Sequence, residues 1–146
     1  MLIIFAIPII IMLLPFIIII GIFSSVNDKI FDKAYKEYLK SINGTQFFCY
    51  NNRKNSQKFI EQNLLPILSK EVKLIFLNGK SVESNFEQKY MSKALHSIKD
   101  RKGFPYLLKV SNGNIIDKSI NKEFYNIKNQ NRELESLTKI INEFYK

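Results

Sequence analysis

The chain has a single thiol, Cys49, near the end of the apolar segment TQFFCY (45–50). A cysteine acts as a nucleophile or a redox group only as its thiolate. The polar stretch that follows, NNRKNSQK (51–58), holds no second cysteine, and one thiol cannot form a disulfide within the chain. We therefore expect Cys49 to be a small apolar core residue. The alternative is a degenerate oxidoreductase that uses this one thiol, with a cysteine of a partner.

Cationic side chains follow Cys49 where a helix is predicted to begin. Arg53, Lys54 and Lys58 lie within six positions of one another. With the free backbone amides of a helix's first turn, such charges are able to hold an anion. A solvated loop is the alternative explanation of the same residues.

Other residues that could do chemistry are isolated in the sequence. His96 is the only histidine, and it is predicted on the polar side of its helix. Glu61, Glu83, Asp100 and Asp117 show no paired spacing on a shared face, and no glycine-rich phosphate loop occurs among the five glycines. The sequence therefore predicts no catalytic site, no metal site and no cofactor.

The elements that would position these residues alternate between strand and helix. Apolar runs predict strands at 45–50 and 72–77, and Asn112-Gly113 predicts a hairpin between YLLKV and NIIDKSI. Helices are predicted at 55–69, where Pro66 must kink or end the helix, at 84–98 and at 132–145. Ser84 and Glu87 have the spacing of a capping box at the start of the second of these helices. The order is strand, helix, strand, helix, hairpin, helix.

That order, together with GFPYLLKVSNGNIID (103–117), resembles the thioredoxin fold. The resemblance covers residues 45–146 and implies an α/β domain, with a central mixed sheet flanked by helices. It also implies a cis peptide bond between Phe104 and Pro105. The slot for the redox cysteine pair of that family falls near residues 54–57, and neither cysteine is present.

The resemblance without the cysteine pair predicts a domain that has no redox chemistry. We expect a protein- or peptide-binding or scaffold module, whose partner the sequence does not identify. In redox relatives the rim around the proline accepts an extended peptide. The corresponding rim here comprises Asn52, Arg53, Lys54, Asn55, Ser56, Gln57, Phe104 and Pro105.

An uncharged segment of 22 residues, 2–23, precedes this domain. As a helix it would be about 33 Å long, enough to cross a hydrocarbon core of about 30 Å. A cleaved signal peptide is the alternative, but no Lys or Arg precedes the segment, and its length exceeds the usual apolar core. The sequence thus predicts a transmembrane anchor at 1–24, with the lipid bilayer as a partner.

An amphipathic juxtamembrane helix is predicted at 25–44, between the anchor and the domain at 45–146. Its apolar residues share one face, and four lysines share the other. This helix would either dock on the domain or lie in the lipid surface. The lysines after the anchor favour a single-pass membrane protein with a cytoplasmic domain over a periplasmic one.

The net charge of +9 raises the question of nucleic-acid binding. The chain has 19 Lys but only 3 Arg, and Arg is the residue whose planar fork reads bases and phosphates. We interpret most of the excess as solvated surface charge, and we do not expect a nucleic-acid partner.

Overall fold

The computed structural model of this protein describes residues 26–130 and 132–146, which fall into two compact units divided between Glu37 and Tyr38. Residues 26–41 are helical, as the apolar period predicts. Within the second unit, the end of this helix packs on the domain. Leu39 is buried, the Tyr38 ring lies 4.5 Å from the Tyr90 ring, and the Tyr38 hydroxyl accepts a hydrogen bond from the backbone of Glu87.

The prediction of a membrane-spanning protein needs correction. Over residues 26–130 and 132–146, no helix combines the length and the apolar character that crossing a bilayer requires. A crossing takes about 20 consecutive apolar residues, whereas the helices of the domain are short and have a polar face; α5, for example, has 11 residues (Glu135–Tyr145). The finding contradicts the predicted single-pass membrane localisation with a cytoplasmic domain, which we withdraw. The predicted anchor itself, 2–23, lies outside the described residues.

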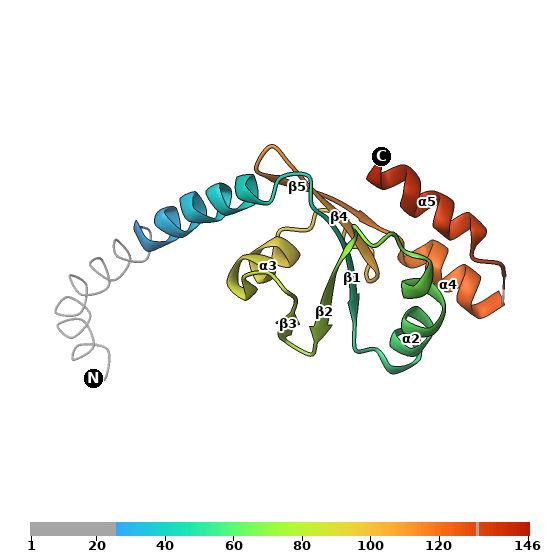
Figure 1. Cartoon of the computed structure of the whole chain (residues 1–146). Coiled ribbons are helices and arrows are strands. Elements are labelled where there is room, and N and C mark those ends of the chain that lie inside the picture. The colour runs from blue at the N-terminus through green and yellow to red at the C-terminus, as the bar shows by residue number, and fades with distance from the viewer. Residues whose placement is uncertain (1–25, 131) are drawn as a thin grey trace, which may run out of the picture. The chain divides into compact units, whose positions relative to one another are not determined.

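Five strands form one mixed sheet in the second unit (Figure 1). They are β1 (Gln46–Asn51), β2 (Lys73–Asn78), β3 (Ser81–Glu83), β4 (Tyr106–Ser111) and β5 (Asn114–Ser119), in the spatial order β3-β2-β1-β4-β5. β1 and β2 are parallel, while β4 is antiparallel to β1 and β5 is antiparallel to β4. The predicted strands at 45–50, 72–77 and 106–110 therefore lie side by side, which confirms a mixed α/β fold.

Helices cover both faces of this sheet (Figure 1). On one face lie α2 (Lys54–Phe59), α4 (Asn121–Gln130) and α5; on the other lies α3 (Gln88–His96). Side chains of β1 alternate between the two layers. Phe48 belongs to the apolar cluster shared with α4 and α5, whereas the Phe47 ring contacts Phe86 just before α3, with ring centres 5.0 Å apart.

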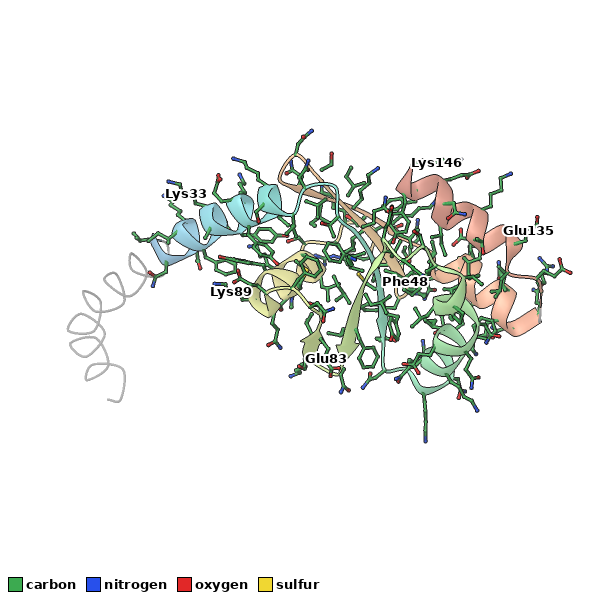
Figure 2. The ribbon with its side chains drawn as sticks, viewed as in Figure 1. Lys33, Phe48, Glu83, Lys89, Glu135 and Lys146 are labelled. Carbon is green, nitrogen blue, oxygen red and sulfur yellow. The ribbon has the colours of Figure 1, made fainter. Side chains whose placement is uncertain are left out.

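The apolar cluster on the α2, α4 and α5 face is the larger part of the core. Figure 2 shows Phe48 directed into the interior, while the labelled charged residues Glu135 and Lys146 lie at the outside. Burial of these apolar side chains is the main source of the fold's stability. The buried members are Phe48, Tyr50, Ile60, Leu64, Val72, Leu107, Ile120, Phe124, Ile127, Leu137, Ile141 and Tyr145.

The predicted helix 55–69 differs from the structure in its regularity. Only Lys54–Phe59 is α-helical; Ile60–Leu64 is a π-helical turn and Leu65–Ile67 is a 3₁₀ turn. Pro66, which lacks an amide hydrogen, lies within the 3₁₀ turn, and the helical segment ends at the next residue, Ile67. Ile60 and Leu64 are buried, whereas Ile67, which follows the wider turn, is 45% exposed.

Two further elements were not predicted, and one helix begins later than expected. β3 pairs with β2 after the turn at Asn78-Gly79, and α4 follows β5. The predicted capping box is wrong: α3 begins at Gln88, because the Ser84 hydroxyl is bonded instead to the backbone of Phe86 two residues on.

The hairpin was predicted correctly. Asn112 and Gly113 both have positive φ, 51° and 72°, and they connect β4 to β5. Asparagine and glycine tolerate this conformation best, which is why the dipeptide is a strong hairpin signal.

Candidate functional site

The junction between β1 and α2 forms one wall of a pocket. The Asn51 side chain accepts a hydrogen bond from the backbone N–H of Arg53 at 3.4 Å, in the manner of an Asx turn. The Arg53 carbonyl then accepts the N–H groups of Ser56 and Gln57 at 2.8 and 2.9 Å, which starts the helix. These contacts place Arg53 and Ser56 next to each other beyond the carboxyl end of β1.

The segment 99–105, before β4, forms the opposite wall. Its start is held by Asp117 of β5, whose carboxylate accepts the backbone N–H groups of Lys99 and Asp100. Asp100 in turn accepts the backbone N–H of Ser119 at 3.0 Å. That hydrogen bond is the main reason why the pKa of Asp100 is lowered, and the neighbouring Lys102 lowers the pKa further. The segment is thus fixed by carboxylates that bind backbone amides.

Gly103 sets the path of the chain into the pocket. Its carbonyl accepts the Ser119 hydroxyl at 2.6 Å, and its N–H donates to the Tyr106 hydroxyl at 3.0 Å. Its φ of +110° is a conformation that side-chain-bearing residues rarely adopt. The Phe104–Pro105 peptide bond that follows is cis, as the resemblance implied.

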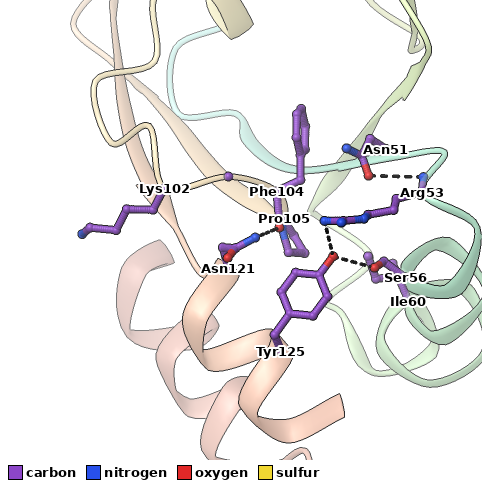
Figure 3. A pocket seen from close by; sticks show the side chains of 10 residues that line it. Asn51, Arg53, Ser56, Ile60, Lys102, Phe104, Pro105, Asn121 and Tyr125 are labelled. Atoms are coloured by element: carbon purple, nitrogen blue, oxygen red, sulfur yellow. Dashed lines mark hydrogen bonds between the residues drawn. The ribbon is translucent and has the colours of Figure 1, made fainter. Parts of the chain in front are cut away.

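The two walls meet at a pocket of about 680 Å³, which we call the Arg53 pocket (Figure 3). Tyr125 of α4 closes it from below the two walls. The lining residues are Asn51, Arg53, Ser56, Ile60, Lys102, Gly103, Phe104, Pro105, Asn121 and Tyr125.

A short chain of hydrogen bonds crosses the Arg53 pocket. The hydroxyls of Ser56 and Tyr125 are 2.8 Å apart, and the Arg53 guanidinium donates to the Tyr125 hydroxyl at 3.3 Å. The guanidinium carbon also lies 5.8 Å from the centre of the Tyr125 ring, and the Lys128 ammonium lies 5.9 Å from it. Cations attract the face of an aromatic ring, so Tyr125 holds Arg53 in place.

The pocket is electropositive and polar. No Asp or Glu is among the described residues that line it. Lys102 pairs with Asp100 at 3.2 Å, and Figure 3 shows its side chain extending away from the Tyr125 hydroxyl. Arg53 is therefore the cation that faces the pocket, and an anionic group is the ligand that suits it.

The predicted rim divides into two groups. Arg53, Ser56, Phe104 and Pro105 come together at the pocket, although about 50 positions separate the two pairs. The other four predicted residues, Asn52, Lys54, Asn55 and Gln57, do not line it. Asn52 instead bonds to the Asn78 side chain and Gln57 to Glu61, because a helix start directs successive side chains in different directions.

Sequence reasoning missed several lining residues, of which Asn121 and Tyr125 matter most. Both lie on α4, which was not predicted. The signal was present, since Ile120, Phe124 and Ile127 have helical spacing. The Ser119 hydroxyl also accepts the Asn121 N–H at 3.2 Å, a contact typical of a helix start.

Cys49 lies outside the pocket, in the middle of β1. It is fully buried between Ile75 of β2 and Tyr106 of β4, and burial raises the pKa of its thiol well above the usual range. A thiol in this state is neither ionised nor accessible at neutral pH. In the part of the chain that the structure describes, no group of His, Cys, Asp or Glu side chains is arranged to hold a metal ion.

No family model matches the chain, and neither a curated protein nor a solved structure matches it.

Proposed function

We propose that residues 45–146 form a thioredoxin-like domain that has no thiol–disulfide chemistry and binds a segment of another protein at the Arg53 pocket. The observation that carries the proposal is the composition of that pocket. It joins Arg53 and Ser56 with Phe104 and Pro105, the two parts of the rim that accepts peptides in redox relatives, and it contains no thiol.

The arrangement of the sheet supports the thioredoxin-like part of the proposal. The parallel pair β1 and β2 and the antiparallel hairpin β4 and β5 occur in the order strand, helix, strand, helix, hairpin, followed by the two helices α4 and α5, with β3 as an added edge strand. The cis bond before Pro105 is at the position that the resemblance implies.

The burial of Cys49 argues against the alternative, a single-thiol oxidoreductase. A partner's cysteine cannot attack a sulfur that is fully buried within the sheet without prior unfolding. The pocket that remains accessible is lined by polar and aromatic side chains and has no thiol, which supports a binding role.

A peptide is a suitable ligand because the pocket offers both side-chain and apolar contacts. The half-buried ring of Phe104 stands beside Tyr106, with ring centres 4.9 Å apart, and provides an apolar surface next to the polar chain of Arg53, Ser56 and Tyr125. Aromatic and Arg side chains of this kind contribute most to protein–protein interfaces.

A peptide-display selection tests the proposal. The full chain is immobilised and panned against a random library, and the enriched peptides are synthesised for titration. We expect Phe104→Asp to weaken their binding about 10-fold or more, because it places a charge on the apolar surface. Ile116→Asp is the matched control: Ile116 of β5 is an apolar residue that is 49% exposed and does not line the pocket, so binding should change little.

Two outcomes would overturn the proposal. One is a selection that enriches no peptide for the wild-type chain. The other is a set of enriched peptides that bind Phe104→Asp as tightly as the wild type, while near-ultraviolet circular dichroism shows that the variant is folded.

A further inference from the structure

A second pocket lies on the other side of Phe104. It has a volume of about 770 Å³, and we call it the Leu95 pocket. Phe104 lines both pockets, so the two are adjacent along the surface of one unit. The described residues that line the second pocket are Leu77, Gly79, Lys80, Val82, Ser92, Leu95, His96, Ile98, Arg101, Phe104 and Tyr106.

The two pockets differ in chemistry. Six of the residues that line the Leu95 pocket are apolar or aromatic, and they come from β2, β3, α3, the segment between α3 and β4, and the first residue of β4. Its polar residues include the cations Lys80 and Arg101, and again no carboxylate is among the described lining residues. The Leu95 pocket therefore suits an apolar side chain, whereas the Arg53 pocket suits an anion.

The hydrogen bonds of the Arg53 pocket leave donors for such an anion. Ser56 and Tyr125 each carry one hydroxyl hydrogen, and the bond between them uses one of the two. The Tyr125 oxygen also accepts a hydrogen bond from Arg53. The hydroxyl hydrogen that is not used between Ser56 and Tyr125 can therefore be donated to a ligand. The guanidinium keeps further N–H groups, and a guanidinium pairs with a carboxylate through two parallel bonds.

Asn121 of α4 offers a further donor, next to the wall formed by residues 99–105. One hydrogen of its side-chain amide donates to the Phe104 carbonyl at 2.6 Å. The amide has a second hydrogen. Donors from two elements (Arg53 and Ser56 at the start of α2, and Asn121 and Tyr125 of α4) thus surround the space beside Phe104, as Figure 3 shows.

We propose that the segment bound at Phe104 presents a carboxylate to the Arg53 pocket and an apolar side chain to the Leu95 pocket. The inference rests on the proposed function and specifies its partner: a protein segment in which an acidic group and a bulky apolar residue are close in sequence. The carboxylate is supplied either by an Asp or Glu side chain or by the chain terminus, since both present the same two oxygens.

The test uses the peptides from the display selection. The wild-type chain should enrich peptides that contain an acidic residue near a large apolar one. Replacing the acidic residue by its amide should weaken binding about 10- to 100-fold, the range expected for the loss of a charged hydrogen-bonded pair. Amidation of the peptide's C-terminus distinguishes a terminal carboxylate from a side-chain one.

Substitutions in the two pockets show which pocket binds the acidic group of the peptide and which binds its apolar side chain. Arg53→Gln should cause a loss similar to that of the acid-to-amide peptide, and the two losses should not add when combined. Arg53→Glu should shift a new selection from acidic to basic residues. Leu95→Ser should weaken peptides that carry the apolar residue about 10-fold, and should leave the discrimination between acid and amide unchanged.

The outcomes separate this inference from the proposed function. Peptides that depend on Phe104 but show no acidic preference, and that bind Arg53→Glu unchanged, would overturn the inference and leave the proposed function standing. The same applies if the apolar residue can be replaced by Ala without loss in the wild-type chain, a result that does not depend on the folding of any variant. A selection without peptides that depend on Phe104 would overturn both.

Discussion

The middle of β1 and its carboxyl end have opposite properties, although only two positions separate Cys49 from Asn51. Cys49 is fully buried, with β2 on one side of its strand and β4 on the other. Asn51 is half-buried and lines the Arg53 pocket, where polar groups face open space. The carboxyl ends of parallel strands commonly form such sites, because the covering helices begin beyond the sheet.

Position along the strand, more than residue type, therefore decides what chemistry is available. The most reactive atom of the chain, the Cys49 sulfur, is placed where burial suppresses its ionisation. Less reactive groups, the hydroxyls and the guanidinium, are placed where a ligand can reach them. The three predictions below test the two regions in order of decreasing effect.

The largest effect concerns the reactivity of Cys49. Because the thiol is buried and its pKa is raised, alkylation requires that the fold opens first. We expect iodoacetamide at pH 8 to react with the native chain at least about 1,000-fold more slowly than with the chain in denaturant, as an opening free energy of about 4 kcal/mol implies. Mass spectrometry of quenched time points measures both rates. A native rate close to that of the unfolded chain would show that the Cys49 thiol is accessible in the folded chain.

A smaller effect is expected for Gly103→Ala in the pocket wall. A Cβ there would be 3.0 Å from the Asn121 side-chain nitrogen, and the φ of +110° is unfavourable for alanine. We expect a loss of about 2 kcal/mol in the free energy of unfolding. Urea titration measures the loss.

Gly44→Ala is the matched control for that loss. Its φ is also positive, +82°, but a Cβ would meet nothing within 4 Å. It should cost about 1 kcal/mol, from backbone strain alone. Equal losses for the two variants would mean that the contact with Asn121 does not constrain the wall.

The smallest effect concerns Asp100, which also holds the pocket wall. Its pKa is lowered in the fold, mainly by the Ser119 backbone N–H. The carboxylate therefore contributes its full stabilisation above the pKa of the unfolded chain, about 3.9, and the contribution disappears as the pH falls through the folded-state pKa. Asp100→Asn should be less stable than the wild type at pH 7, and the difference should shrink below about pH 4. Urea titrations at both pH values measure it, and a difference independent of pH would contradict the assigned role.

Much of the fold could be predicted from local patterns. The runs at 45–50, 72–77 and 106–110 are apolar over a strand's length, and the Asn112-Gly113 turn fixes the register of the hairpin. These features predict strands and a hairpin because each depends on a few consecutive residues. The π-helical turn at Ile60–Leu64 and the short edge strand β3 lack such a signal, since each is stabilised by packing or pairing with other elements.

The candidate site was predicted in part, for a related reason. Arg53, Ser56, Phe104 and Pro105 were proposed from the resemblance, and the structure brings these four together. Tyr125 was not proposed, because its role depends on where α4 lies relative to α2, which no local pattern specifies.

The alternating order of strands and helices, and the single thiol without a second one beside it, can be read from the chain directly. They follow from residue type and short-range periodicity, which act within a few positions. The burial of Cys49, the contact between Arg53 and Tyr125, and the position of Phe104 between a polar and an apolar pocket arise from the folded structure. The physical reason is that burial and contact depend on segments that are far apart in the sequence, from 26 positions for Cys49 and Ile75 to 72 for Arg53 and Tyr125, and folding is what places them side by side.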